Sequence, residues 1–170
     1  MSLNDAITLP TRSGIALDVR PARESDAEAL AQFFEQVTED DRRFRFFAAA
    51  DRVSPQQIAP IVKADHYQTE SWLGFSDQGQ IVASGVLAYD DQGDTGEVAI
   101  SVRGDHKGKG VGWAMLEFLG NQAEKRGCKR VIAIESRENS AAIEVERDKG
   151  FLPEPFFGDP TLVLLSKSYD

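Results

Sequence analysis

The sequence predicts a mixed α/β (α+β) fold in which a mostly antiparallel central sheet of about seven strands is flanked by four helices. One observation is that short segments with alternating apolar residues, typical of strands, are bounded by turn sequences. A second is that segments with apolar residues at helical spacing lie between them. A third is their order, which is strand, two helices, three strands joined by tight turns, helix, strand, helix and two closing strands.

The N-terminal part begins with residues 1–14, which are polar and rich in turn formers, so we expect a loose arm or a short edge strand there. A single domain is expected over residues 15–170, because this length is typical of one hydrophobic core. Its first strand covers residues 15–20. Ser25 and Glu28 have the spacing of a capping box and predict the start of the first helix.

The second helix is predicted from Ser54, Pro55 and Gln57, which combine an N-cap, a proline in the first turn and a capping partner. Between the two helices, residues 38–47 mix acidic, basic and aromatic side chains without a clear period. One interpretation is the solvated end of a helix with its aromatic residues beneath it. The other is a segment that lines a ligand site.

Three strands in the middle of the chain are separated by the turn sequences Ser-Asp-Gln-Gly and Asp-Asp-Gln-Gly-Asp. They are expected at residues 71–75, 80–88 and 95–103. A nearly continuous apolar run at residues 130–135 is typical of a strand that is covered on both faces. Asn139 then caps a last helix, and closing strands are expected near Phe151 and at residues 161–165.

Glycines at every second position, Gly108, Gly110 and Gly112, connect the third of these middle strands to a long helix. Glycine lets the backbone approach a ligand closely, and the free N–H groups of a helix start favour an anionic group. Lys107 and Lys109 add positive charge. We interpret this turn as a cradle for a pyrophosphate, and a connection that only reverses the chain is the alternative.

Two other phosphate-binding motifs fit this turn poorly. A P-loop needs Ser or Thr after its Gly-Lys pair to hold magnesium, whereas Gly110 follows Gly108-Lys109 here. A dinucleotide fingerprint needs a third glycine three residues after the second, whereas Trp113 occupies that position.

Composition limits the classes of function. The formal net charge is −9, which argues against non-specific nucleic-acid binding and against an anionic membrane surface. No apolar run approaches the ~20 residues of a membrane-spanning helix. The single cysteine, Cys128, excludes an internal disulfide, so a cytoplasmic location is expected. No metal site is expected, because His66 lacks companion ligands.

The glycine turn resembles motif A of the GNAT superfamily of acetyl-CoA-dependent N-acetyltransferases. The segment Lys107-Gly-Lys-Gly110-Val-Gly112 carries this resemblance, with Lys107 in place of the usual Gln or Arg. The helix from Asn139 to Gly150-Phe151 resembles the second motif, and the order of elements matches along essentially the whole chain. The resemblance implies that amides of the turn hold the coenzyme A pyrophosphate and that the preceding strand pairs with the pantetheine arm. The residues expected to bind acetyl-CoA are Ile100, Val102, Lys107, Gly108, Lys109, Gly110, Val111, Gly112 and Asn139.

Acetyl transfer from a thioester to an amine needs a group that removes a proton from the amine, and Glu97 is our candidate. By period two it lies on the same side of its strand as Ala99 and Ser101. A carboxylate among small or apolar residues can have a raised pKa, which suits a base at neutral pH. The alternative is an exposed, solvated side chain at the start of the strand.

The chain looks most like the catalytic domain of bacterial protein lysine acetyltransferases. The resemblance is carried by Val19-Arg-Pro-Ala22, Arg45-Phe-Phe47, Asp65-His-Tyr67 and Gly96-Glu-Val-Ala99. It implies that Glu97, on the fourth strand, is the general base. It also implies that an interruption of this strand frees backbone N–H groups, including that of Val102, and that residues 38–47 border the acceptor.

A proton donor for the leaving thiolate is less evident. Many GNAT enzymes place a tyrosine on the last helix for this purpose, but counting from Asn139 puts Glu146 at that position. The helix contains no tyrosine. We therefore expect Ser140 or a water molecule to act as the acid.

These observations predict an N-acetyltransferase that moves an acetyl group from acetyl-CoA to a primary amine by direct attack in a ternary complex, as a monomer or homodimer. A lysine side chain of a protein is the expected acceptor. A small amine, a polyamine or an amino acid is the alternative acceptor. A non-catalytic acyl-CoA-binding module is the alternative of a different class, which would keep the glycine turn and lose the base.

Overall fold

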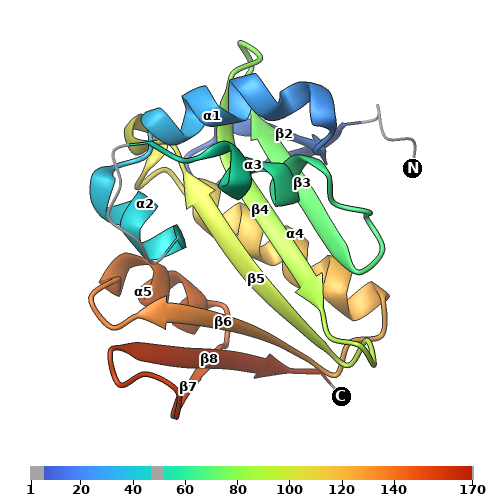
Figure 1. Cartoon of the computed structure of the whole chain (residues 1–170), viewed down its shortest axis with the longest axis vertical. Coiled ribbons are helices and arrows are strands. Elements are labelled where there is room, and N and C mark those ends of the chain that lie inside the picture. Colours follow the sequence, from blue (N-terminus) through green and yellow to red (C-terminus); the bar gives the residue numbers. More distant parts are fainter. Residues whose placement is uncertain (1–5, 47–51, 170) are drawn as a thin grey trace.

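The computed structural model describes residues 6–46 and 52–169, which form one eight-stranded sheet with helices on both faces (Figure 1). The strand order is β1-β2-β3-β4-β5-β6-β8-β7, and among these described strands only the β5–β6 pair is parallel. The strands are β1 (Ile7–Pro10), β2 (Ala16–Pro21), β3 (Thr69–Phe75), β4 (Ile81–Tyr89), β5 (Thr95–Val102), β6 (Arg130–Ser136), β7 (Leu152–Glu154) and β8 (Leu162–Ser168). The α-helices are α1 (Ala27–Glu35), α2 (Glu39–Phe46), α3 (Pro55–Val62), α4 (Val111–Lys125) and α5 (Ser140–Asp148), with short 3-10 helices at Glu24–Asp26 and Gly104–His106.

The predicted fold class is confirmed, with one strand and one helix more than expected in the described residues. Of the two alternatives for the N-terminal part, the edge strand is confirmed and the loose arm is wrong for residues 7–10, which form β1 and pair with β2. The additional helix is α2. None of its residues is fully buried, which explains why its sequence shows no apolar stripe. Its acidic first turn and basic last turn complement the helix dipole instead.

The helix caps are partly as predicted. The capping box at Ser54 is confirmed, since its hydroxyl accepts the N–H of Gln57 at 3.3 Å. The capping box predicted at Ser25 is wrong. A 3-10 turn precedes α1, and the side chain of Asp26 accepts the N–H of Arg23 at 2.9 Å and pairs with Arg20 at 2.8 Å.

Two apolar clusters cover the two faces of the sheet. One joins α4 to β4, β5, β6 and β8, with α5 packed against it. The other joins α1 and α3 to β3 and β4, with Phe46 of α2 packed against it. Side chains of β5 therefore divide between the faces. Val98, Ile100 and Val102 pack with the α4 cluster, and the alternate residues Glu97, Ala99 and Ser101 face the α2 side.

The sheet divides at its parallel pair. Strands β5 and β6 are paired only at three positions, Thr95↔Arg130, Gly96↔Val131 and Glu97↔Ile132. Beyond them β5 stays paired with β4, and β6 stays paired with β8. Figure 1 shows the two strands close together at one end and diverging toward α2 and α5. The divergence leaves two unpaired strand edges inside the molecule.

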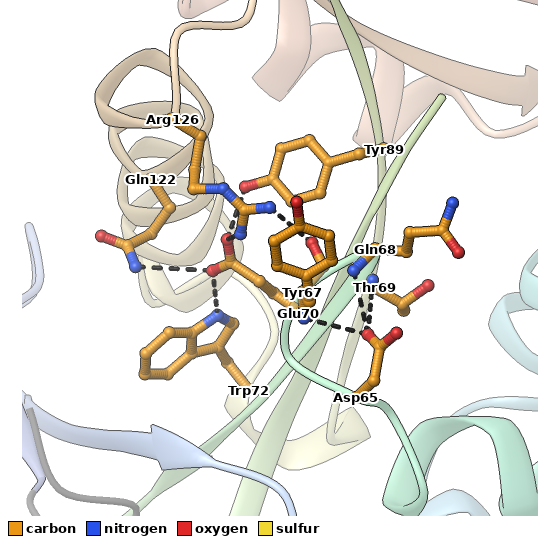
Figure 2. A network of polar contacts seen from close by, with 9 residues as sticks. All are labelled: Asp65, Tyr67, Gln68, Thr69, Glu70, Trp72, Tyr89, Gln122 and Arg126. Carbon is orange, nitrogen blue, oxygen red and sulfur yellow. Dashed lines mark hydrogen bonds and ion pairs between the residues drawn. The ribbon is translucent and has the colours of Figure 1, made fainter. Parts of the chain in front are cut away.

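A buried polar network fastens the C-terminal end of α4 to β3 and β4 (Figure 2). The side chain of Glu70 is buried and accepts hydrogen bonds from Trp72 Nε1 at 3.0 Å and from the Tyr89 hydroxyl at 2.5 Å. Its carboxylate also pairs with Arg126 of the α4 C-terminus at 3.1 Å. The guanidinium carbon of Arg126 lies 4.3 Å from the centroid of the Tyr89 ring.

The same arginine holds the loop before β3, as Figure 2 shows. Arg126 donates to the carbonyl of Tyr67, and Asp65 Oδ1 accepts three successive N–H groups that begin with that of Tyr67. His66, between them, has a φ of +58°. The Asp65–Tyr67 motif therefore shapes a loop at the end of α4 remote from the glycine turn.

Candidate active site

A cavity of about 320 Å³ opens where β5 and β6 diverge. Its walls come from β5 and β6, the glycine turn and first turn of α4, α5, α2 and the turn between β1 and β2. Because α2 lies on one face of the sheet and α4 with α5 on the other, the cavity is reached by side chains from both faces.

The backbone of β5 presents hydrogen-bonding groups to this cavity. The N–H of Arg103, just after the strand, donates to the carbonyl of Val82 in β4 at 2.9 Å. Alternate residues of an antiparallel strand direct their backbone groups to opposite edges. The groups directed toward the diverging β6 are therefore those of Val98, Ile100 and Val102. Strand β5 pairs with β4 without a bulge, so the expected interruption is absent, and divergence from β6 frees these groups instead.

The glycine turn, residues 107–112, enters α4 through left-handed backbone at Gly108 (φ +76°) and Gly110 (φ +81°). A Cβ atom on Gly110 would lie 3.1 Å from the backbone nitrogen of Arg12, so this position needs glycine for space as well as for conformation. No described side chain caps α4, which leaves the N–H groups of its first turn for a ligand or water.

The two lysines of the turn have different surroundings. Lys107 lines the cavity, and its ammonium pairs with Asp41 of α2 at 2.7 Å. Lys109 is exposed and lies outside the cavity lining, while its carbonyl accepts the hydroxyl of Ser13 at 2.7 Å. The adjacent Arg12 lines the cavity. The turn between β1 and β2 is thus a wall of the site, which the sequence did not indicate.

Glu97 projects from the α2 face of β5 into the cavity. Although its side chain reaches solvent, partial burial raises its pKa, and the charge of Arg45 opposes that shift. Arg45 of α2 lines the same cavity and is influenced by the charges of Glu97 and Glu135, while burial lowers the pKa of its guanidinium. The carboxylate of Glu97 is therefore suited to accept a proton, with its pKa set by partial burial and by the charge of Arg45.

A pair of carboxyl groups occupies the other face of the cavity. Glu135 of β6 and Glu146 of α5 are hydrogen bonded to each other, and Asn139 Nδ2 donates to Glu135 Oε2 at 3.2 Å. Glu146 is only 6% exposed, and its Oε1 has no hydrogen-bond partner among the described residues. Two carboxyl groups in contact must share a proton, and burial together with Glu135 raises the pKa of Glu146 far above its usual range.

The cavity brings together nearly all of the predicted site residues. It is lined by Glu97, Ile100, Val102, Lys107, Gly108, Gly110, Val111, Gly112 and Asn139. Lys109 and Ser140 are not among the lining residues. Ser140 is exposed at the first position of α5, in a separate depression with Ile143 and Arg147, because residues three and seven positions apart share a helix face. Its position does not support the predicted role as acid.

Several cavity residues were not predicted. Among them are Arg12 and Glu135. Asp41 and Arg45 were expected only as part of a segment, whose Phe47 lies outside the described residues, and Glu146 only as the position at which the family places a tyrosine. A signal was available for Glu146, because it follows Val145 and lies four positions after Ala142 on the helix face that also lines the cavity. Of the two interpretations of residues 38–47, the lining of a ligand site agrees with the positions of Asp41 and Arg45.

Within the described residues, no group of three or more His, Cys, Asp or Glu side chains is arranged to hold a metal ion. In the same part of the chain, no helix combines the length and the apolar character that crossing a bilayer requires.

The sequence model of the acetyltransferase (GNAT) family matches residues 26–151. The chain belongs to this family. This GNAT protein is 24% identical over 149 residues to an acetyltransferase of Pseudomonas aeruginosa, and the match covers 86% of the chain and 80% of that relative.

Solved structures agree with the family assignment. The GNAT domain of S. lividans PAT superposes with a TM-score of 0.88 at 28% identity, over 96% of this chain and 97% of that one. The yncA protein of Salmonella typhimurium, solved with its cofactor acetyl-CoA, has a TM-score of 0.69 at 19% identity, over 91% and 94% of the two chains. The predicted enzyme class is confirmed, and this GNAT protein is an acetyltransferase.

Proposed function

We propose that this acetyltransferase moves the acetyl group of acetyl-CoA to a primary amine, with a lysine side chain of a protein as acceptor, by direct attack in a ternary complex. The observation that supports the proposal is the set of groups that line one cavity. It combines an unpaired strand edge, an uncapped glycine turn and a carboxylate of raised pKa on the opposite face of the sheet.

The α4 face of the cavity suits acetyl-CoA. The backbone groups of Ile100 and Val102 offer hydrogen bonds to the amides of a pantetheine arm lying in the place of a missing strand. The free N–H groups around Gly108 and Gly110 are arranged for a pyrophosphate at the positive end of the α4 dipole. Lys107 supplies a cation beside it once phosphate competes with Asp41.

The α2 face suits the amine. Glu97 lies on this face of β5, close to the point where the backbone edge of the strand becomes free. Its raised pKa favours removal of a proton from the amine, directly or through a water molecule. The amine would thus enter from the side opposite to the coenzyme.

Direct attack is favoured over an acetyl-enzyme intermediate by the placement of nucleophiles. The single cysteine, Cys128, is 4% exposed and is not part of the cavity lining. Burial also raises the pKa of its thiol, which makes it a weaker nucleophile at neutral pH. A ternary complex needs neither the cysteine nor a second chemical step.

A protein lysine as acceptor is supported by charge and by similarity. Asp41, Glu97 and Glu135 line the cavity and attract a cationic amine. The motifs that resemble bacterial protein lysine acetyltransferases lie on the same chain, which superposes closely on the GNAT domain of S. lividans PAT.

Arg45 favours a second acceptor class, the free amino acids. Its side chain lines the cavity and feels the charges of Glu97 and Glu135, and none of the described carboxylates lies within ion-pair distance of it. An amino acid could place its carboxylate on Arg45 and its amine toward Glu97. A lysine side chain in a protein offers no such carboxylate.

The test is the release of free coenzyme A from acetyl-CoA with three acceptors: a lysine-rich protein, a polyamine and a set of free amino acids. Release only with the protein supports the proposed acceptor, whereas release only with amino acids supports the Arg45 alternative. Glu97→Gln should lower turnover by about a hundredfold or more with little change in the Kd for acetyl-CoA. Glu28→Gln, an exposed change on α1, is the matched control. Full turnover in Glu97→Gln would remove the base from the mechanism.

A further inference from the structure

The carboxyl pair formed by Glu135 and Glu146 is not used by the mechanism above. Both residues line the cavity, yet they lie on the face of the sheet that carries α4 and α5. Glu135 alternates along β6 with the same parity as Val131 and Ala133, which belong to the α4 cluster. The pair therefore shares its face with the glycine turn, and Glu97 lies on the opposite face.

Proton-bearing groups in the cavity are few. His106 is hydrogen bonded to Asp105, and Lys107 is paired with Asp41. The guanidinium of Arg45 is a very weak acid, as is the hydroxyl of a serine. Glu146 differs from all of these, because it is buried and holds or shares a proton with its partner carboxyl, and because its Oε1 has no hydrogen-bond partner in the part of the chain that the structure describes.

We propose that Glu146 is the general acid of the reaction and donates a proton to the coenzyme A sulfur as the thioester carbon–sulfur bond breaks. This inference rests on the proposed direct attack of an amine. The amine nitrogen forms the new carbon–nitrogen bond and gives its proton to Glu97. The electron pair of the breaking bond goes to sulfur, which takes the proton of Glu146. Glu97 then loses a proton to solvent and Glu146 regains one, so the charges and atoms balance.

The partner carboxyl positions and tunes this acid. Glu135 is fixed by the hydrogen bond from Asn139, the residue that also caps α5. Its negative charge and its hydrogen bond raise the pKa of Glu146, beyond the larger effect of burial. Among the neighbouring elements, α2 contributes Arg45, whose charge lowers the pKa of Glu135. Strand β5 contributes Glu97, which faces the opposite side of the sheet, and α4 contributes the neutral side chains of Val111, Trp113 and Leu116.

The test compares Glu146→Gln with Glu144→Gln, the same change at an exposed position of the same helix. Glutamine keeps the size of the side chain and carries no acidic proton. With any acceptor that the wild type uses, Glu146→Gln should lower the single-turnover rate by about tenfold to a hundredfold, with acetyl-CoA Kd unchanged. Glu144→Gln should match the wild type. A rate within twofold of the wild type in Glu146→Gln would overturn the proposal.

A second variant keeps the proposal testable if Glu146→Gln folds poorly. Glu135→Gln removes the neighbouring negative charge and so lowers the pKa of Glu146. The alkaline limb of the kcat–pH profile, where the acid loses its proton, should then move to lower pH. A purely structural pair would leave that limb in place, and this outcome would also refute the proposal.

A spectroscopic measurement separates this inference from the proposed function. At pH 7 the infrared spectrum of the wild type should contain the carbonyl band of a protonated carboxyl group. The difference between the wild-type and Glu146→Gln spectra should contain this band, because the variant lacks it. If no acceptor supports turnover, the proposed function fails, whereas absence of this band in an active wild type would overturn the acid and leave the proposed function intact.

Discussion

Replacing Glu70 by glutamine is expected to destabilise the protein without weakening acetyl-CoA binding. Glu70 is buried, and its carboxylate joins Trp72, Tyr89 and Arg126 (Figure 2). Glutamine has the same size and keeps one acceptor oxygen, but it leaves the charge of Arg126 without a counterion. The change therefore removes the ion pair and one acceptor oxygen while it preserves the volume of the side chain.

The magnitude follows from the burial of the two partners. Removing one partner of a fully buried ion pair costs about 3–5 kcal/mol. The Arg126 side chain is 36% exposed, so water recovers part of this loss. We expect a destabilisation of about 2 kcal/mol, which for a chain of this length lowers Tm by about 4–8 °C.

The assay is thermal and urea unfolding of Glu70→Gln beside Glu28→Gln, a surface control on α1. Acetyl-CoA affinity should stay within twofold, because the 15 residues of α4 place the glycine turn about 22 Å from Arg126. A loss below about 0.5 kcal/mol would refute the reasoning, since that is the size expected of a surface substitution. Equal losses in the two variants would refute it as well.

Two further predictions concern charges in the cavity. Asp41→Asn should tighten acetyl-CoA binding by about twofold to fivefold, because the substitution frees Lys107 to bind phosphate. Calorimetry should show that this gain in affinity becomes smaller as the salt concentration is raised. Weaker binding would contradict it. Arg45→Met removes the cation that lowers the pKa of Glu97. Since the base acts when ionised, the acid limb of the kcat/KM profile should move to higher pH, and an unmoved limb would count against Glu97 as the base.

The elements that the sequence predicted correctly are those with local signals. The glycine turn, the cap at Asn139 and the alternating strands each depend on residues within a few positions of one another. Helix α2 has no buried stripe, so its charges and aromatic residues gave no period. The parting of β5 from β6 is a property of pairing between strands, which spacing along one strand cannot reveal.

The sequence predicted only those site residues that lie close to one motif along the chain. Glu97 and the glycine turn lie within sixteen residues of each other, and both line the cavity. Ser13 meets the carbonyl of Lys109 across 96 positions of the chain, a contact without any local pattern. Glu146 was noted as a departure from a family motif, and only its contact with Glu135 indicated a chemical role.

Because β5 and β6 pair at only three positions, the sheet consists of two parts that are joined along a short line. Strands β1 to β5 form one part of the sheet and β6, β7 and β8 form the other, and α4 packs across the line between them. A ligand that hydrogen bonds along the open edge of β5 takes the part of a missing strand. In the proposed ternary complex the pantetheine arm is therefore a temporary structural member of the fold, and each catalytic cycle completes the sheet along β5 and opens it again.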